Sequence, residues 1–253
     1  MKFKIIVSSF AFFILFLYLS LIISAFLYFD IDNFTSDIFS ERTFFSIKLS
    51  VITASISTLL SIIISIPAAY ALSRYNFFGK NLIDLFLELP LILSPAALGA
   101  TLLIFFSNSV GIWLQENITQ IIFTFWAVII AQFVSILGIS TRMVKSIMDE
   151  IPKRYEDIAR TLGATPMQAF FTISLPLSKK GLLSVFIMTW AKAFGEFGAT
   201  FTIAGTMAMK TETIPVSIFM KLSNADVNGS IAMIMVLVST GISLLFITKL
   251  IKS

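Results

Sequence analysis

A short charged segment between two apolar stretches decides how the rest of this chain is interpreted. It reads Glu156-Asp157-Ile158-Ala159-Arg160-Thr161-Leu162-Gly163, and after nine further residues the chain continues Ile173-Ser174-Leu175-Pro176. Helix-compatible residues precede Gly163, and glycine suits the left-handed position that follows a helix. Thr165-Pro166-Met167-Gln168 then has the pattern of a capping box with proline in the first turn. The segment therefore predicts a helix, a tight glycine turn and a second helix.

The first of these helices is expected to be amphipathic. Ile158, Ala159 and Leu162 share one face, and Glu156 and Arg160 are spaced i,i+4 with the acid first, which favours an ion pair. A short helix with a small apolar face and a charged rim fits a groove on a partner protein or the surface of a membrane. These residues alone leave both possibilities open.

The composition indicates a membrane protein. Of the 253 residues, 57% are hydrophobic and 13% are charged, and the mean hydropathy is +0.96, whereas soluble domains carry about 25% charged residues. So many apolar residues do not fit one soluble core, and we expect a single integral membrane domain over residues 1–253. The chain has no His and no Cys, which excludes disulfides, Cys/His zinc sites and imidazole catalysis.

Six segments are predicted to cross a membrane, because each approaches the roughly 20 apolar residues that a spanning helix needs. They cover about residues 5–29, 49–72, 89–106, 118–139, 182–205 and 231–248. Pro90, Pro95 and Gly99 interrupt the third, so we expect a kinked or broken helix there. The first is expected to be an uncleaved span. The fold class predicted is all-α, with about six transmembrane helices and a loop over about residues 140–181 between the fourth and fifth.

The distribution of basic residues predicts the orientation. Thirteen of the 18 Lys and Arg residues fall at the two termini and in the loops that share their side, four fall in the other loops, and Lys192 lies within a span. Positive residues concentrate in cytoplasmic segments. Both termini and the 140–181 loop are therefore expected in the cytoplasm. Because the positive charge is explained by topology, the net charge of +4 does not indicate nucleic-acid binding.

The segment from Glu156 to Pro176 resembles the "EAA…G…I-x-LP" signature of permease subunits of binding-protein-dependent ABC importers. In that family the segment is a coupling helix that docks in a cleft of the ATPase. The resemblance implies an ATPase-docking set that comprises Glu156, Asp157, Ile158, Ala159, Arg160, Leu162 and Gly163. Here Ile158-Ala159 stands in place of the family's alanine pair, and Asp157 occupies the acidic position.

The resemblance also implies partners and location. We expect a prokaryotic inner-membrane, multi-pass protein that pairs with a second copy of itself, two ABC ATPase subunits and an extracytoplasmic oxyanion-binding protein. The sequence contains no Gly-x-x-x-x-Gly-Lys-Ser/Thr loop. ATP and Mg are therefore expected on the partner ATPase, with no cofactor and no enzymatic activity on this chain.

The fifth predicted span points to the cargo. It reads Trp190-Ala191-Lys192-Ala193-Phe194-Gly195-Glu196-Phe197-Gly198-Ala199-Thr200. This resembles the "R-A-x-G-E-F-G-A-T" run of permeases for tetrahedral oxyanions. Thr200 favours molybdate, because the sulfate branch more often has valine there. The runs 211–219 and 89–95 resemble further stretches of the same permeases.

The candidate pathway or gate residues are Pro90, Pro95, Lys192, Gly195, Glu196, Gly198 and Thr200. A charge in mid-bilayer costs at least about 2.5–3.5 kcal/mol, and Lys192 and Glu196 are one turn apart and can pair. The pair either faces the translocation pathway or fixes helix packing without meeting the anion. Gly195 and Gly198 are expected to allow close helix approach.

Hydroxyl residues line one face of the second predicted span at spacings of three and four, namely Ser50, Thr53, Ser57, Ser61 and Ser65. Small hydroxyl residues let membrane helices pack closely, and they could also line a path for a hydrated anion. Packing is the favoured interpretation.

Three alternative functions are considered. The first is the same importer with sulfate, tungstate or phosphate as cargo. The second is an ion-coupled secondary transporter, which usually has internal repeats and mid-membrane coupling carboxylates. The third is an intramembrane enzyme, which the absence of His and Cys disfavours.

Overall fold

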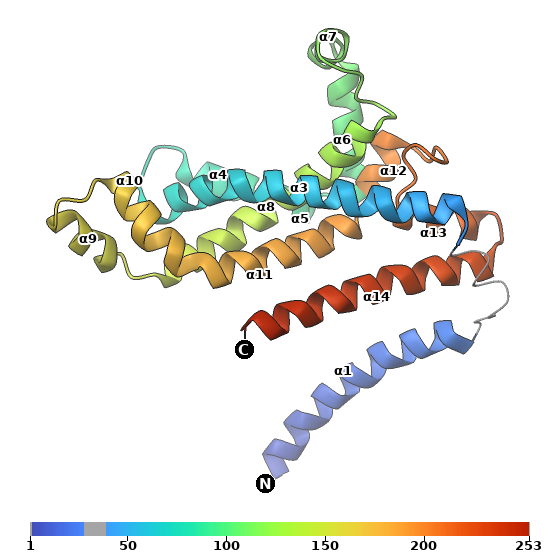
Figure 1. The fold of residues 1–253 in the computed structure, drawn as a ribbon, viewed down its shortest axis with the longest axis horizontal. Coiled ribbons are helices and arrows are strands. Elements are labelled where there is room, and N and C mark those ends of the chain that lie inside the picture. The colour runs from blue at the N-terminus through green and yellow to red at the C-terminus, as the bar shows by residue number, and fades with distance from the viewer. Residues whose placement is uncertain (1, 28–38, 253) are drawn as a thin grey trace.

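The computed structural model describes residues 2–27 and 39–252, and every regular element within these two ranges is a helix (Figure 1). The helices are α1 (Lys2–Leu27), α3 (Glu41–Arg74), α4 (Lys80–Phe86), α5 (Leu89–Ile92), α6 (Pro95–Ser107), α7 (Ser109–Asn117), α8 (Phe125–Glu150), α9 (Arg154–Thr161), α10 (Pro166–Ala169), the π-helical turn η1 (Phe170–Ser174), α11 (Leu175–Phe194), α12 (Gly198–Ala204), α13 (Ile214–Ser223) and α14 (Val227–Lys252). The predicted all-α class is confirmed.

Four helices in the described ranges are long and apolar enough to cross a membrane. They are α1 over Val7–Ser24, α3, α8, and the run Pro166–Phe194 formed by α10, η1 and α11. The bent pair Lys80–Ile92 and Pro95–Ser107 adds a fifth if it counts as one span. Within α14, Val227–Ser243 counts as a shorter apolar helix. Six spans therefore remain a prediction, and residues 28–29 of the first lie outside the described residues.

The long helices α3 and α8 pack against each other and are joined by buried hydroxyl groups. Ser57 Oγ donates to the carbonyl oxygen of Ile129 at 3.0 Å, and the hydroxyls of Ser61 and Ser65 lie 2.6 and 2.7 Å from that of Ser140. The five hydroxyl residues singled out in the sequence are all buried, namely Ser50, Thr53, Ser57, Ser61 and Ser65. The packing interpretation of this face is confirmed.

The third predicted span is broken, as expected. Pro90 lies in the first turn of α5, and Pro95 is the first residue of α6. The missing N–H of proline costs nothing at such positions. Ser94 caps α6 by accepting the N–H of Ala97 at 3.2 Å, and the two arms of the span bend by 113°.

The fifth predicted span, over 182–205, is not one helix, and that prediction is wrong. The helix α11 ends at Phe194, and α12 starts at Gly198. The Glu196 carboxylate accepts the N–H of Ala199 at 3.1 Å, so it satisfies a backbone donor at the start of the second helix. The span therefore continues after a break at residues 195–197.

The fourth predicted span, over 118–139, is displaced along the chain. The helix α8 begins at Phe125 and continues to Glu150. Residues 118–124 precede it as an irregular segment, because the Gln115 side chain accepts the N–H groups of both Ile121 and Ile122, and Phe123 donates its N–H to Ile203 at 3.1 Å. Residues 140–150, the first part of the loop predicted over 140–181, therefore belong to this helix.

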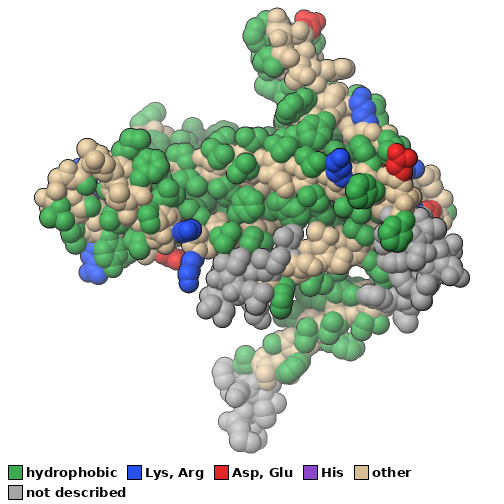
Figure 2. All heavy atoms as spheres, viewed as in Figure 1, with side chains coloured by type: hydrophobic (Ala, Val, Ile, Leu, Met, Phe, Trp, Pro, Cys, Tyr) green, Lys and Arg blue, Asp and Glu red, His purple; other side chains and the backbone are tan. Residues whose placement is uncertain are grey.

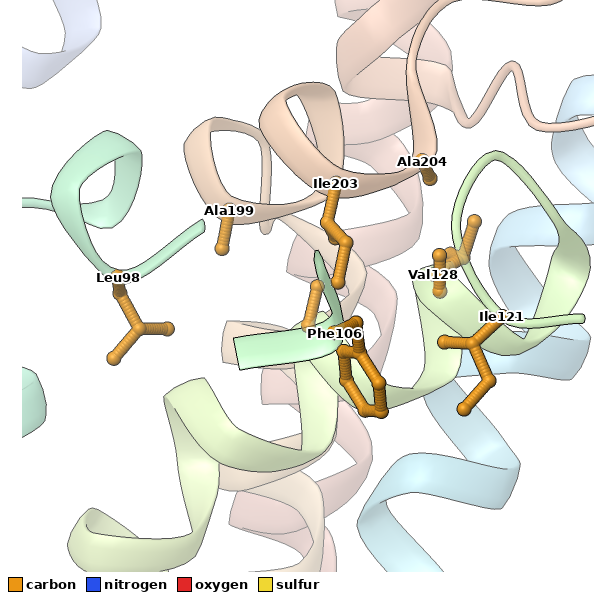
Figure 3. Packing of buried hydrophobic residues seen from close by; sticks show 9 residues of the cluster. Leu98, Phe106, Ile121, Val128, Ala199, Ile203 and Ala204 are labelled. Atoms are coloured by element: carbon orange, nitrogen blue, oxygen red, sulfur yellow. The ribbon is translucent and has the colours of Figure 1, made fainter. Parts of the chain in front are cut away.

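The second halves of the two broken spans pack together into one apolar cluster (Figure 3). It contains Leu98 and Phe106 from α6, Val128 from α8, and Ala199 and Ile203 from α12. A Cβ added at Gly99 would lie 2.7 Å from the Cβ of Thr202, so α6 and α12 approach as closely as a glycine permits.

Charged side chains lie toward the two ends of the long axis in the view of Figure 2, and the stretch between them is largely apolar. Large hydrophobic side chains on α1, α3 and α11 are exposed, among them Phe16, Ile63 and Met188. A band of apolar surface between two charged ends fits a bilayer with water on both sides.

Candidate functional site

The segment 154–174 forms the predicted helix, glycine turn and helix at one end of the bundle (Figure 1). Gly163 has a φ of +94°, its N–H bonds to Arg160 O, and the N–H of Ala164 bonds to Ala159 O, both at 3.0 Å. This is the Schellman pattern of a helix C-terminus. The capping box at Thr165 and Gln168 is present with both of its hydrogen bonds. The local prediction is confirmed.

The second helix of this unit leads without interruption into α11. The π-helical turn η1 stands directly before Leu175 and Pro176. Proline cannot donate to the carbonyl four residues earlier and would crowd it, so a widened turn before Pro176 accommodates the ring. The second helix of this unit is thus the beginning of a helical run, Pro166–Phe194.

An apolar groove opens on the outer side of this unit. It is lined by Tyr155, Ile158, Ala159, Leu162, Thr172, Ile173, Pro176 and Leu177. Ile158 is 56% exposed and Leu162 is 84% exposed. Side chains this apolar, exposed together and rimmed by charge, mark an interaction site. The face predicted from Ile158, Ala159 and Leu162 exists, and it is widened by residues of η1 and α11.

Glu156, by contrast, is buried, with an exposed fraction of 5%. Its Oε1 accepts from Arg74 Nε at 2.7 Å and from Ser174 Oγ at 2.6 Å, and its Oε2 accepts from Tyr70 Oη at 2.8 Å. The expected i,i+4 pair with Arg160 is wrong, because the carboxylate turns inward to α3. Glu156 therefore presents no carboxylate oxygen to a partner.

Burial by itself raises the pKa of the Glu156 carboxyl. The hydrogen bonds from Ser174, Arg74 and Tyr70 outweigh that effect and hold its pKa below the ordinary value of 4.5. The carboxylate is therefore ionised at neutral pH. A buried charge of this kind persists only with full pairing.

The other two charged members of the predicted docking set lie at the surface. Asp157 and Arg160 are exposed, with Asp157 in the first turn of α9 and Arg160 in its last turn. Both positions complement the helix dipole. In the chain they stand next to Ile158 and Ala159, which line the groove.

The candidate pathway residues gather around the two helix breaks. A Cβ added at Gly198 would lie 2.7 Å from the Cβ of Pro95, so the break before α12 rests directly on the start of α6. Close approach is confirmed for Gly198. Within the chain, the prediction of close helix approach is wrong for Gly195. This residue is exposed, and an added Cβ would meet only its own helix, at 3.6 Å from Ala191 O.

Lys192 and Glu196 form the expected pair. Lys192 Nζ lies 3.9 Å from Glu196 Oε2, the lysine side chain is 49% exposed and the glutamate side chain 2%. The carboxylate also caps α12 through Ala199, so its role within the chain is structural. Thr200 is fully buried. Within the described residues, no three His, Cys, Asp or Glu side chains gather in a way that could hold a metal ion.

A family comparison decides the class of protein. Residues 61–253 match the family described as the binding-protein-dependent transport system inner membrane component. The chain belongs to this permease family. It is accordingly a membrane subunit of a transport system.

Curated relatives agree with this membership, and a solved structure shares the fold. The sulfate transport system permease protein CysT of Escherichia coli (strain K12) is 30% identical over 81% of this chain and 75% of its own length. The molybdenum transport system permease protein ModB of Haemophilus influenzae (strain ATCC 51907 / DSM 11121 / KW20 / Rd) is 34% identical over 69% of this chain and 77% of its own. A chain in the crystal structure of a bacterial alginate ABC transporter, in complex with its pentasaccharide-bound periplasmic protein, superposes with a TM-score of 0.77. It covers 97% of this chain and 91% of that one at 17% identity, so this likeness concerns the fold.

The sequence did not predict the partners of two of the permease's buried carboxylates, Glu156 and Glu212. Arg74 and Tyr70 lie more than 80 residues before Glu156 in the chain, and Arg42 lies 170 residues before Glu212, its partner. In the sequence Arg74 is one of the thirteen basic residues whose distribution predicts the orientation. No local pattern pairs residues so far apart.

Proposed function

We propose that this permease is the membrane subunit of an ATP-driven importer for tetrahedral oxyanions, with molybdate as its anion. The observation that carries the proposal is the exposed apolar groove on α9, η1 and α11, set beside a charged rim in the segment that resembles the family's ATPase-docking signature. Tyr155, Ile158 and Leu162 are exposed together along this groove, and a contiguous apolar patch, unlike a single exposed leucine, marks an interaction site. A partner that covers the groove gives that surface a function.

The ATPase is proposed to be a separate chain. The permease sequence lacks a phosphate-binding loop, so the energy must be delivered through a contact. The ATPase would receive α9 in a cleft, cover the apolar groove and bind the exposed charges of Asp157 and Arg160. In this proposal ATP and Mg belong to that partner.

The continuous helical run suggests how a movement of the ATPase would reach the membrane. A displacement of α9 passes through the capped turn into α10, η1 and α11, which reaches the break at Gly195. Packed helices shift as rigid bodies and bend at breaks. The two breaks, at residues 93–94 and 195–197, are in contact through Gly198 and Pro95, which favours a gate at this place.

A homodimer is proposed because one chain is small for a pore with a gate. Lys192 keeps half of its side chain exposed in the single chain, although it lies in a predicted span. A charge there belongs in a water-filled cavity or in a protein interface. Two copies that face each other across a central path would provide one.

The proposed topology places both termini and the docking unit in the cytoplasm. In Figure 1 the start of α1 and the end of α14 both point toward the end of the long axis that carries α9. This common direction supports the orientation predicted from the Lys and Arg distribution.

The choice of anion rests on the sequence alone. Permeases named for sulfate and for molybdenum match this chain at 30% and 34% identity, and both anions are tetrahedral oxyanions. Thr200 favours molybdate by resemblance, yet its side chain is buried, so selectivity is expected to reside mainly in the binding protein. Sulfate and tungstate are the anions to compare.

The test is the ATPase activity of the permease co-purified with its candidate ATPase in lipid. Binding protein loaded with molybdate, tungstate, sulfate or phosphate is added in turn. We expect stimulation by the molybdate-loaded protein above the others. Stimulation only by the sulfate-loaded binding protein would identify sulfate as the cargo. Failure of any ATPase to co-purify would contradict the proposal and favour an ion-coupled transporter.

A further inference from the structure

Two buried carboxylates each receive an arginine from α3, one at either end of that helix. At its C-terminal end Arg74 pairs with Glu156, with side-chain exposures of 6% and 6%. At its N-terminal end Arg42 pairs with Glu212, which is fully buried. These are called below the Glu156 pair and the Glu212 pair.

The Glu156 pair joins four segments of the chain. Arg74 Nε donates to Glu156 of α9, and Arg74 Nη2 donates to Ile151 O, directly after α8, at 2.9 Å. Glu156 also accepts from Ser174 at the end of η1. Tyr70 of α3 donates to the same carboxylate, and its ring packs edge-on against Phe170, with ring centroids 4.7 Å apart. The docking unit is thus tied to the end of α3 by charge-assisted hydrogen bonds, the strongest kind in proteins.

The Glu212 pair is bidentate. Arg42 Nε lies 2.8 Å from Glu212 Oε2, and Arg42 Nη2 lies 2.9 Å from Oε1. Thr211, Glu212 and Thr213 are all fully buried, and Ser50 of α3 accepts the N–H of Ile214 at 2.8 Å. The segment between α12 and α13 is therefore held to the start of α3.

The helix between the two pairs is long and is fixed along its length. A helix of 34 residues extends about 50 Å, which exceeds the hydrocarbon core of a bilayer. The hydroxyl contacts of Ser57, Ser61 and Ser65 bind it to α8 over its middle. Pro67 inside the helix removes one of its hydrogen bonds, and Ser73 beyond it donates to Asp149 of α8, so α3 packed on α8 forms the element that joins the two ends.

We propose that α3 links the ATPase-docking unit on one side of the membrane to the 206–213 segment on the other, and that Glu156 and Glu212 are the positioning residues of this link. The proposal rests on the proposed function, because it takes α9 as the place where the ATPase binds. It differs from the family resemblance at one residue: Glu156 holds the docking helix and does not touch the partner. Binding-protein contact outside and ATPase contact inside would then bias the same rigid element, as coupling between two sites requires.

The experiment uses the co-purified complex in lipid with three readouts: ATPase retained on the permease, ATPase activity without binding protein, and stimulation by molybdate-loaded binding protein. The variants are Glu156→Gln, Glu212→Gln and the double variant. The matched controls are Glu150→Gln and Glu41→Gln, which change exposed glutamates near the same two ends.

Each single variant is expected to retain the ATPase and to lose stimulation by roughly 2- to 30-fold, the range of coupling effects of residues that contact neither partner. The controls are expected to keep stimulation. Because both residues act on one element, the double variant is expected to lose no more stimulation than the single variant with the larger loss.

Three results would overturn the proposal. Loss of the ATPase from Glu156→Gln, to the extent seen with Leu162→Ala, would make Glu156 a docking contact. Unchanged stimulation in both single variants would remove the link. A double variant that loses the product of the two single effects would show two independent sites. In each case the unaltered complex still shows stimulation, which separates this failure from failure of the proposed function.

A second double variant keeps the test decisive if the glutamine variants fold poorly. Arg74→Met combined with Glu156→Leu leaves no unpaired buried charge, and such apolar replacements of buried pairs are often neutral for stability. It is expected to fold, to retain the ATPase and to lose stimulation. Full stimulation in this variant would overturn the role of the charged pair.

Discussion

Leu162→Ala tests the docking groove most directly, because the side chain is 84% exposed in the free chain. The leucine carries three more carbon atoms than alanine, worth about 0.8 kcal/mol each when buried, and 84% of that total is about 2 kcal/mol. If the ATPase covers this position, its dissociation constant should rise about 30-fold. The thermal stability of the permease alone should not change, since the folded chain does not bury this side chain.

The measurement is a titration of labelled ATPase onto the permease in lipid nanodiscs. Leu222→Ala is the matched control, because Leu222 is an exposed leucine on α13, away from the docking unit in Figure 1. The control should bind as the unaltered chain does. A rise of less than about threefold for Leu162→Ala would correspond to under about 0.7 kcal/mol and would refute the reasoning that the partner covers this groove.

Three further predictions concern the turn, the helix breaks and the buried carboxylate. Gly163→Ala should lower the stability of the turn by about 1–2 kcal/mol through the positive φ alone, since no atom lies within 4 Å of the added Cβ. Hydrogen exchange of the α9 amides should accelerate, and an unchanged exchange rate would contradict the left-handed turn. Gly198→Ala should lower the melting temperature, because overpacking against Pro95 costs about 1–3 kcal/mol, whereas Gly241→Ala, with open space around it, should not. The pKa of Glu156 is depressed in the folded chain, so its contribution to the free energy of unfolding is complete above the ordinary glutamate pKa and is lost as pH falls through the folded pKa. Protection of the α9 amides from hydrogen exchange should therefore decrease at low pH in the unaltered chain and not in Glu156→Gln. Identical pH profiles of the two chains would contradict the pairing.

The buried Glu156 pair is better understood as a device for position than for stability. Removal of one partner from a buried ion pair costs about 3–5 kcal/mol, whereas replacement of both by apolar residues is often neutral. The same chain could therefore hold α9 with apolar contacts. A carboxylate that accepts from three donors fixes the direction of α9 as well as its distance from α3, as the proposed link requires.

The sequence by itself determined the features that depend on near neighbours in the chain. Apolar length predicts spanning helices, and Pro90 and Pro95 predict the break in the third span, because each acts through its own backbone. The glycine turn at Gly163 and the capping box at Thr165 follow from hydrogen bonds within four residues. The apolar face of α9 follows from helical periodicity.

Only the tertiary structure decided which side chains meet across long separations. Glu156 had a local candidate partner in Arg160, and it pairs with Arg74 because burial between α3 and η1 offers two further hydrogen bonds, from Tyr70 and Ser174. The fifth span breaks at residues 195–197 because Glu196 can cap a new helix whose Gly198 fits against Pro95. The hydroxyl face of α3 meets α8, and periodicity could not distinguish that face from a path for anions. Each of these outcomes depends on the free energy of the whole packed molecule, which a local sequence pattern does not describe.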